Sequence, residues 1–155
     1  MKLALGFDTS ALVSLGHTDL FEFIVDNYCI VVTESILKEL EEIARFEDED
    51  GNAAQKWLQR SSKLDLRETE KKRLGEDEVF EICKNEGIPI VTDDIRAVKR
   101  FEDKIDCFFS VHVVYLLYKK GLISKERAIL SVEKMRTERD WRTNLISVTS
   151  KTLFD

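Results

Sequence analysis

The sequence predicts an α/β protein: a three-layer α/β/α sandwich with a mainly parallel central sheet. Short apolar runs rich in β-branched residues recur at residues 3–7, 28–33 and 88–92, and helix-like amphipathic segments separate them. Alternation of strands and helices is typical of a parallel sheet covered by helices on both faces. The chain has 155 residues, so we expect a single domain over residues 1–155.

In the first half of the chain, "LALGF" (3–7) is the first expected strand, and residues 8–27 suit two short helices interrupted near Gly16. "YCIVVT" (28–33) is the next strand, and Thr33 suits the N-cap of the helix that follows. One apolar face of that helix contains Ile36, Leu37, Leu40, Ile43 and Ala44. We expect an acidic loop at 45–52, a short helix at 53–62, and a short strand or extended linker at 63–68.

In the second half, residues 75–87 predict a helix closed by Gly87, followed by a strand at 88–92. A charged helix is expected at 94–104. A very short strand at 107–109 leads into a largely buried helix that ends near Gly121. Ser124 suits the N-cap of an amphipathic helix at 124–138, and the tail from residue 140 predicts a last short helix.

Composition excludes several classes of protein. The formal net charge of −6 argues against nonspecific duplex binding, unless the negative charge is gathered in a site that metal ions neutralise. The three cysteines show no CxxC spacing, so we expect reduced thiols in a cytoplasmic protein. The two histidines, His17 and His112, are isolated in the sequence, and we expect them to be surface or helix-packing residues and not catalysts. No long apolar span predicts a membrane segment, and no GxGxxG or P-loop predicts a nucleotide cofactor.

Acidic residues follow two of the predicted strands. Asp8 comes directly after residues 3–7, and Asp93 and Asp94 come directly after residues 88–92. Ligands of parallel sheets bind outside the carboxyl ends of the strands, so these acids are candidate metal ligands. Each also suits a helix N-cap or a turn, and the local sequence leaves both interpretations open for Asp8.

Further acids lie on predicted helices. Glu39 borders the apolar face between Ile36 and Ile43, and Glu76 and Glu78 lie in a first helical turn, where the helix dipole favours acids. Each position alone has an ordinary explanation. If the acids converge at one edge of the sheet, they repel one another and their pKa values rise. Mg²⁺ or Mn²⁺, which prefer oxygen ligands, would relieve that repulsion.

The ordered set resembles a PIN domain. It comprises Asp8-Thr9-Ser10 after a strand, Glu39 in "LKELEEI", "GEDEVFEICKNEGIPIVTDD" from Gly75, and the downstream "VVYLLYKKGLISKERAILSVEKMR". The likeness is to the branch with a "GE" helix start followed by a strand and "DD". It covers nearly the whole chain. Bulky Val79, Phe80 and Ile82 replace the usual small alanines, which leaves open which acid of this helix points inward.

The resemblance implies a metal-dependent endoribonuclease that hydrolyses RNA phosphodiester bonds. By position, the acidic quartet is Asp8, Glu39, Glu76 and Asp94, with Asp8, Glu76 and Asp94 as metal ligands. Ser10, Thr92, Asp93 and Glu78 are auxiliary residues. From the residues themselves, Arg96, Lys99 and Arg100 flank the expected site and are candidate phosphate contacts. The alternative is a catalytically degenerate PIN-like module that binds RNA or protein.

Expected partners follow from the resemblance and from the apolar stretches. Many PIN domains are toxins of toxin–antitoxin pairs, so RNA and an antitoxin protein are the expected partners. The stretches "FEFIV" (21–25) and "CFFSVHVVYLLY" (107–118) exceed the needs of a small core, which favours a homodimer or a groove for an antitoxin helix.

Overall fold

The computed structural model describes residues 2–69, 75–141 and 145–155. Its strands are β1 (Leu3–Phe7), β2 (Tyr28–Thr33), β3 (Asp65–Arg67), β4 (Ile90–Val91) and β5 (Cys107–Phe108). Its helices are α1 (Thr9–Gly16), α2 (Phe21–Asn27), α3 (Glu34–Ala44), α4 (Glu49–Leu58), α5 (Gly75–Glu86), α6 (Ile95–Phe101), α7 (Ser110–Lys119), α8 (Lys125–Glu138) and α9 (Leu145–Phe154), with a 3₁₀ turn at Ser61–Lys63.

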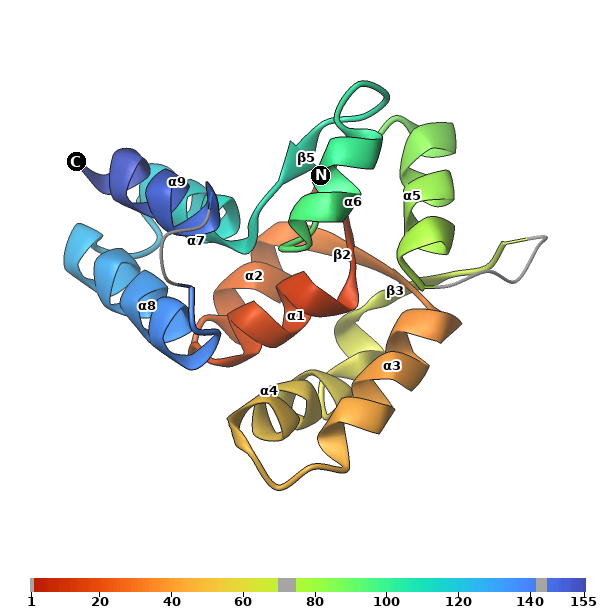
Figure 1. Cartoon of the computed structure of the whole chain (residues 1–155), viewed down its shortest axis with the longest axis horizontal. Coiled ribbons are helices and arrows are strands. Elements are labelled where there is room, and N and C mark those ends of the chain that lie inside the picture. The colour runs from red at the N-terminus through yellow and green to blue at the C-terminus, as the bar shows by residue number, and fades with distance from the viewer. Residues whose placement is uncertain (1, 70–74, 142–144) are drawn as a thin grey trace.

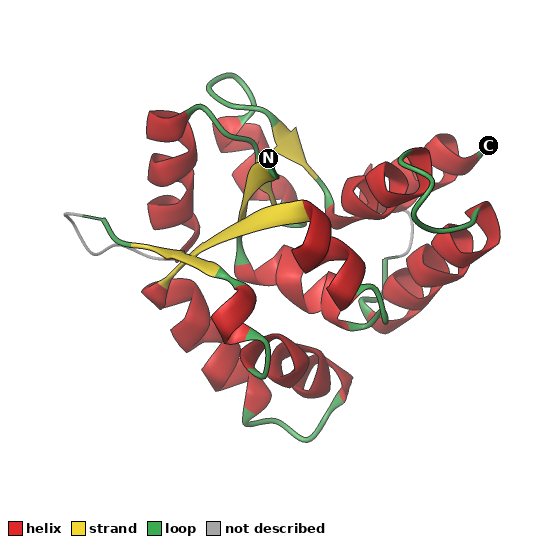
Figure 2. Ribbon diagram, turned by 180° about the vertical axis from the view of Figure 1, so that it is seen from behind, coloured by secondary structure: helices red, strands yellow, loops and turns green. Residues whose placement is uncertain are grey.

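The strands form one five-stranded parallel sheet in the order β3-β2-β1-β4-β5. Helices surround it on both faces (Figure 1, Figure 2), so the predicted three-layer α/β/α fold is confirmed. β1 lies in the centre and pairs with β4, with Phe7 opposite Val91. The chain segments that follow β1 and β4 therefore leave the sheet side by side, at its carboxyl edge.

The two faces of β1 show how the layers pack. A Cβ atom at Gly6 would lie 2.2 Å from Sγ of Cys83 on α5, so the absence of a side chain at Gly6 lets α5 lie close to the sheet. Leu5 and Phe7 alternate with Gly6, point to the opposite face and are fully buried. On the face of the sheet at Gly6, α5 contacts α3. On the face at Leu5 and Phe7, α2 contacts α7.

Two predicted boundaries were wrong. β4 is shorter than the strand expected at 88–92. The expected acidic loop at 45–52 ends early, because the Asp48 side chain accepts a hydrogen bond from the Gly51 N–H at 2.7 Å and caps α4. α4 therefore begins at Glu49, inside the expected loop. The segment at 63–68 contains the edge strand β3. Of the predicted tail helix, residues 142–144 lie outside the described residues.

The apolar stretches at 21–25 and 107–118 lie mainly in the core of this chain. Phe21, Ile24, Val113, Val114 and Leu117 are buried. Their apolar character is explained by the fold and gives no support to a homodimer. The cysteines are free thiols, as expected. Among the described helices, none combines the length and the apolar character needed to cross a membrane.

Candidate active site

A surface cavity of about 330 Å³ lies at the carboxyl edge of the sheet, and Asp8, Glu39, Glu76 and Asp94 all line it. The four acids come from four places: the end of β1, the middle of α3, the start of α5 and the segment between β4 and α6. The rest of the lining is Thr9, Ser10, Val13, Ile43 and Arg139. We call this the acid cavity. The fold thus brings together the four carboxylates that the sequence singled out.

Asp8 is the most deeply buried of these acids, at 4% exposure. Its Oδ1 accepts hydrogen bonds from the Ser10 hydroxyl at 2.7 Å and the Ala11 N–H at 3.0 Å, and its Oδ2 accepts one from the Thr92 hydroxyl. Burial raises the pKa of Asp8 from 3.8 to about 7, although these three hydrogen bonds act in the opposite direction. Asp8 is therefore both a helix N-cap and a member of the acid cavity.

Hydroxyl groups connect the acidic segments to one another. The Thr9 hydroxyl donates to Oε2 of Glu39 at 2.6 Å, which ties α1 to α3. Ser10 Oγ accepts the Asp93 N–H at 2.9 Å, and Thr92 Oγ1 accepts the Asp94 N–H at 3.1 Å. Ser10 and Thr92 thus lie where the sequence placed supporting hydroxyls. The part played by Thr9 was not foreseen, because its partner is 30 residues away in the sequence.

Glu76 is held by a neighbouring cation. An Nη atom of Arg100 donates to Oε1 of Glu76, and a second lies 3.7 Å from Asp77. Burial raises the pKa of Glu76, and the charges of Asp94 and Asp77 act in the same direction, while Arg100 opposes them. Arg100 was predicted to contact phosphate; in this structure it neutralises an acid of the cavity.

The adjacent acids Asp93 and Asp94 have different partners. Oδ1 of Asp94 accepts the Arg96 N–H at 2.9 Å and caps α6, and the side chain lines the acid cavity. Asp93 accepts the N–H of Ser110 at 2.8 Å and its hydroxyl at 2.6 Å, so it anchors the start of α7. Burial raises the pKa of Asp93, and the hydrogen bonds from Ser110 lower it. Of the two, Asp94 lines the acid cavity and Asp93 does not.

Glu78 was predicted as an auxiliary residue of this site, and the structure places it elsewhere. Glu78 lines a neighbouring cavity of about 220 Å³, where the Ser35 hydroxyl donates to it at 2.9 Å. The reason is helical geometry, because residues two positions apart on a helix point in very different directions. With Glu76 in the acid cavity, Glu78 must face away from it.

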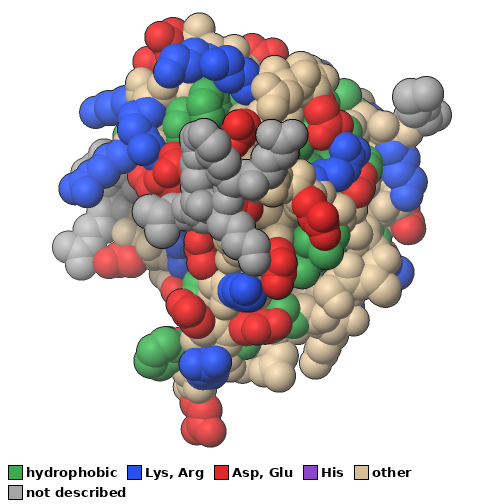
Figure 3. All heavy atoms as spheres, turned by 90° about the vertical axis from the view of Figure 1, so that its right-hand side faces the viewer, with side chains coloured by type: hydrophobic (Ala, Val, Ile, Leu, Met, Phe, Trp, Pro, Cys, Tyr) green, Lys and Arg blue, Asp and Glu red, His purple; other side chains and the backbone are tan. Residues whose placement is uncertain are grey.

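The cation that lines the acid cavity is also not one of those predicted. Arg96 and Lys99 are exposed and do not belong to the lining, whereas Arg139, at the end of α8, does. Its Nη1 lies 2.9 Å from Oδ2 of Asp50. On the face with α3 and α5, acidic and basic side chains are interspersed (Figure 3). Among the described residues seen in this view, charge is therefore mixed.

The donor chemistry of the acid cavity fits Mg²⁺ or Mn²⁺. Its described lining offers carboxylate and hydroxyl oxygens and neither His nor Cys. A cation would also stabilise the ionised form of the buried Asp8 carboxyl. Glu39 and Glu76 are turned toward Thr9 and Arg100, however. Among described residues, the group whose ligand atoms lie within 4.8 Å of one another is elsewhere, at His17, Glu49 and Glu138.

Comparison with known proteins adds no family. No protein-family model matches the sequence, and no curated protein matches it at a significant level.

Proposed function

We propose that this chain is an endoribonuclease that depends on Mg²⁺ or Mn²⁺, with a PIN-like arrangement of acids. The observation that carries the proposal is the convergence of Asp8, Glu39, Glu76 and Asp94, from four separate elements, on one open cavity. When bound there, the cation would supply Lewis acidity and lower the pKa of a water molecule for attack on phosphorus. Asp8, Glu76 and Asp94 would hold it.

Several side chains would have roles beside that of the cation. Ser10 and Thr92 hold the Asp8 carboxylate in one orientation from both sides. Asp94 or Glu76 would orient the attacking water by accepting one of its protons in a hydrogen bond. The guanidinium of Arg139 would contact a phosphate oxygen. Because the cation meets the phosphate, the net negative charge of the chain does not oppose RNA binding.

We also propose which molecules the chain binds. The substrate would be single-stranded RNA, and the family resemblance suggests that the chain acts as the toxin of a toxin–antitoxin pair. Support for a protein partner, an antitoxin or a second copy, comes from apolar side chains exposed on α8 and α9: Ile129, Leu130, Leu145 and Val148.

The second candidate is a PIN-like module that binds RNA or protein without cleaving it. The ion pair between Arg100 and Glu76 favours it, because a guanidinium already neutralises one of the four acids. Calorimetric titration with Mn²⁺ separates the candidates. The nuclease requires binding that Asp8→Asn weakens, whereas absence of binding at millimolar Mn²⁺ would favour the module.

The direct test is cleavage of labelled single-stranded RNA by the purified chain in Mg²⁺, in Mn²⁺ and in EDTA. We expect cleavage with either metal, none in EDTA, and at least about a 100-fold lower rate for Asp8→Asn. Asp26→Asn, which changes an exposed acid on α2, is the matched control and should keep the full rate. Equal cleavage by Asp8→Asn and the wild type would rule out the proposal.

A further inference from the structure

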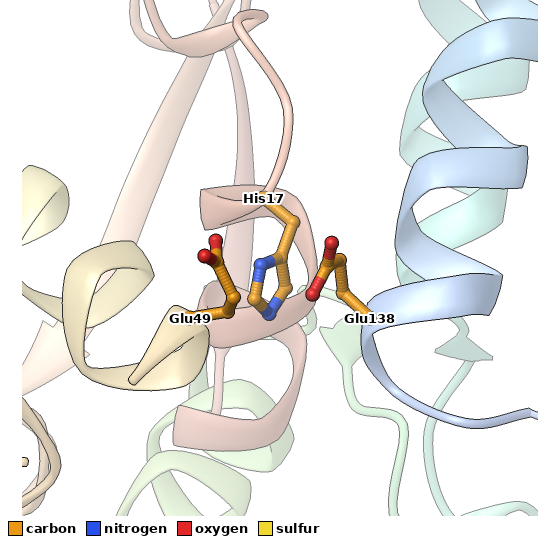
Figure 4. Close-up of side chains that lie close together, drawn as sticks. All are labelled: His17, Glu49 and Glu138. Carbon is orange, nitrogen blue, oxygen red and sulfur yellow. The ribbon is translucent and has the colours of Figure 1, made fainter. Parts of the chain in front are cut away.

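A histidine and two glutamates meet on the side of the molecule formed by α1, α4 and α8. A ring nitrogen of His17 and one carboxylate oxygen from each of Glu49 and Glu138 all lie within 4.8 Å of one another. His17 is the C-cap of α1, Glu49 opens α4 and Glu138 ends α8. Figure 4 shows the imidazole ring between the two carboxylates. We call this group the His17 cluster.

The environment of His17 leaves one ring nitrogen available. The side chain is 2% exposed, and its Nε2 lies 2.7 Å from Oδ1 of Asp50. A carboxylate only accepts hydrogen bonds, so Nε2 carries the proton and a neutral ring keeps its lone pair on Nδ1. Nδ1 has no hydrogen-bond partner among the described residues. This is the usual arrangement of a metal-binding histidine, whose other nitrogen donates to a carboxylate.

The Asp50 carboxylate is itself fixed in place. Its second oxygen, Oδ2, lies 2.9 Å from Nη1 of Arg139. Arg139 therefore orients Asp50, and Asp50 orients the imidazole. The placement of Glu49 in the first turn of α4 has an ordinary explanation in the helix dipole. The dipole does not account for a buried imidazole that lies between two glutamates from different helices.

We propose that His17, Glu49 and Glu138 form a binding site for a first-row transition cation such as Zn²⁺, separate from the acid cavity. One imidazole and two carboxylates suit Zn²⁺ better than Mg²⁺, which prefers oxygen ligands alone. Glu49 is exposed and Glu138 half-buried, so small rotations of these flexible side chains bring the three ligands to bonding distance. Bound metal would join α1, α4 and α8.

One cation already competes for this site. Nζ of Lys134 lies 3.0 Å from Oε1 of Glu138, and the lysine side chain is 51% exposed while that of Glu138 is 22% exposed. Because the lysine is half exposed and flexible, a divalent ion bound by three ligands would displace it. His17 also lines a surface cavity of about 340 Å³, together with the cationic side chains of Lys56, Arg127 and Lys134.

The test uses the imidazole signals of the full-length chain, freed of metal and titrated with Zn²⁺. The chain has two histidines, and His112 is an internal control because its Nδ1 already accepts the Phe109 N–H at 2.8 Å. In ¹⁵N-resolved NMR spectra we expect the His17 ring signals to shift and saturate at one equivalent of Zn²⁺, while those of His112 stay in place. His17 signals that do not move in excess Zn²⁺ would overturn the proposal.

Substitutions locate the ligands by calorimetry. Glu138→Gln and Glu49→Gln should each weaken Zn²⁺ binding by at least about tenfold. Glu133→Gln, which changes an exposed acid of α8 outside the cluster, should not. Lys134→Gln should tighten binding, because it removes the competing cation. Wild-type affinity in both glutamate variants would overturn the assignment. The Asp8→Asn chain should keep this Zn²⁺ site, so failure here is distinguishable from failure of the nuclease proposal.

Discussion

The acid cavity and the His17 cluster both gather carboxylates, but they do so by different means. The acid cavity is a consequence of sheet topology: Asp8 and Asp94 follow paired parallel strands, and hydroxyls of Ser10 and Thr92 fix the buried carboxyl between them. The His17 cluster depends on the ends of three helices, and a single imidazole supplies its buried group. The first offers oxygen ligands alone, and the second adds a nitrogen.

Because their ligands differ, the two sites should select different metals. An oxygen-only site favours hard cations that keep waters for phosphate exchange, whereas imidazole favours first-row transition metals. Under the two proposals, the acid cavity would act on a substrate and the His17 cluster would hold helices together.

The sharpest test of the acid cavity compares two acids on α5. Glu76→Gln should lower the RNA cleavage rate by about a thousand-fold, because it removes a cavity carboxylate. Glu78→Gln should change the rate by less than about threefold, because Glu78 lines a different cavity. Rates are measured at saturating Mg²⁺ after both variants are shown to be folded by circular dichroism. The reverse ranking would mean that the wrong acid has been placed in the site.

The second test concerns the stability of the metal-free chain. The pKa of folded Asp8, about 7, lies above its ordinary value of 3.8, so the fold favours the neutral carboxyl. The contribution of Asp8 to the free energy of unfolding is fully present below about pH 3.8 and is lost as the pH rises through 7. The full loss is about 4 kcal/mol, of which roughly 2–3 kcal/mol falls between pH 5 and pH 8.

Urea unfolding in EDTA at pH 5 and pH 8 measures this loss. The free energy of unfolding of Asp8→Asn, relative to that of the wild type, should rise by roughly 2–3 kcal/mol between pH 5 and pH 8. The reason is that an amide has no charge to bury. Adding Mg²⁺ at pH 8 should restore part of the wild-type stability. Asp26→Asn should follow the wild type at both pH values. If the free energies of unfolding of wild type and Asp8→Asn changed equally between pH 5 and pH 8, ionisation of Asp8 would not destabilise the fold.

The two regions also differ in how far the sequence could predict them. Acids after apolar strands, such as Asp8 and Asp94, could be assigned to one edge because parallel strands end together. The resemblance assigned Glu76 to the quartet and Glu78 to an auxiliary role at the same site, whereas the structure places Glu78 in a different cavity. The residues alone did not fix which acid of this helix faces inward, because bulky Val79, Phe80 and Ile82 stand where small residues are usual. The partners of His17 could not be predicted from the sequence. Asp50 and Glu138 lie on helices that are remote in the chain, and no periodicity links them to position 17.

The smallest expected effects are at Arg139, the residue that the two regions share. Its guanidinium lines the acid cavity and also holds Asp50, the hydrogen-bond partner of His17. Arg139→Gln should raise the KM for RNA by roughly three- to tenfold with little change in kcat, because it removes a phosphate contact and no metal ligand. Zn²⁺ affinity at the His17 cluster should fall by a similar factor, because Asp50 would lose the group that orients it.

Arg136→Gln, on the same helix and paired with Glu133, is the control and should change neither quantity. An effect on RNA cleavage alone would show that the two regions act independently, and an effect on both would establish Arg139 as the physical link between them.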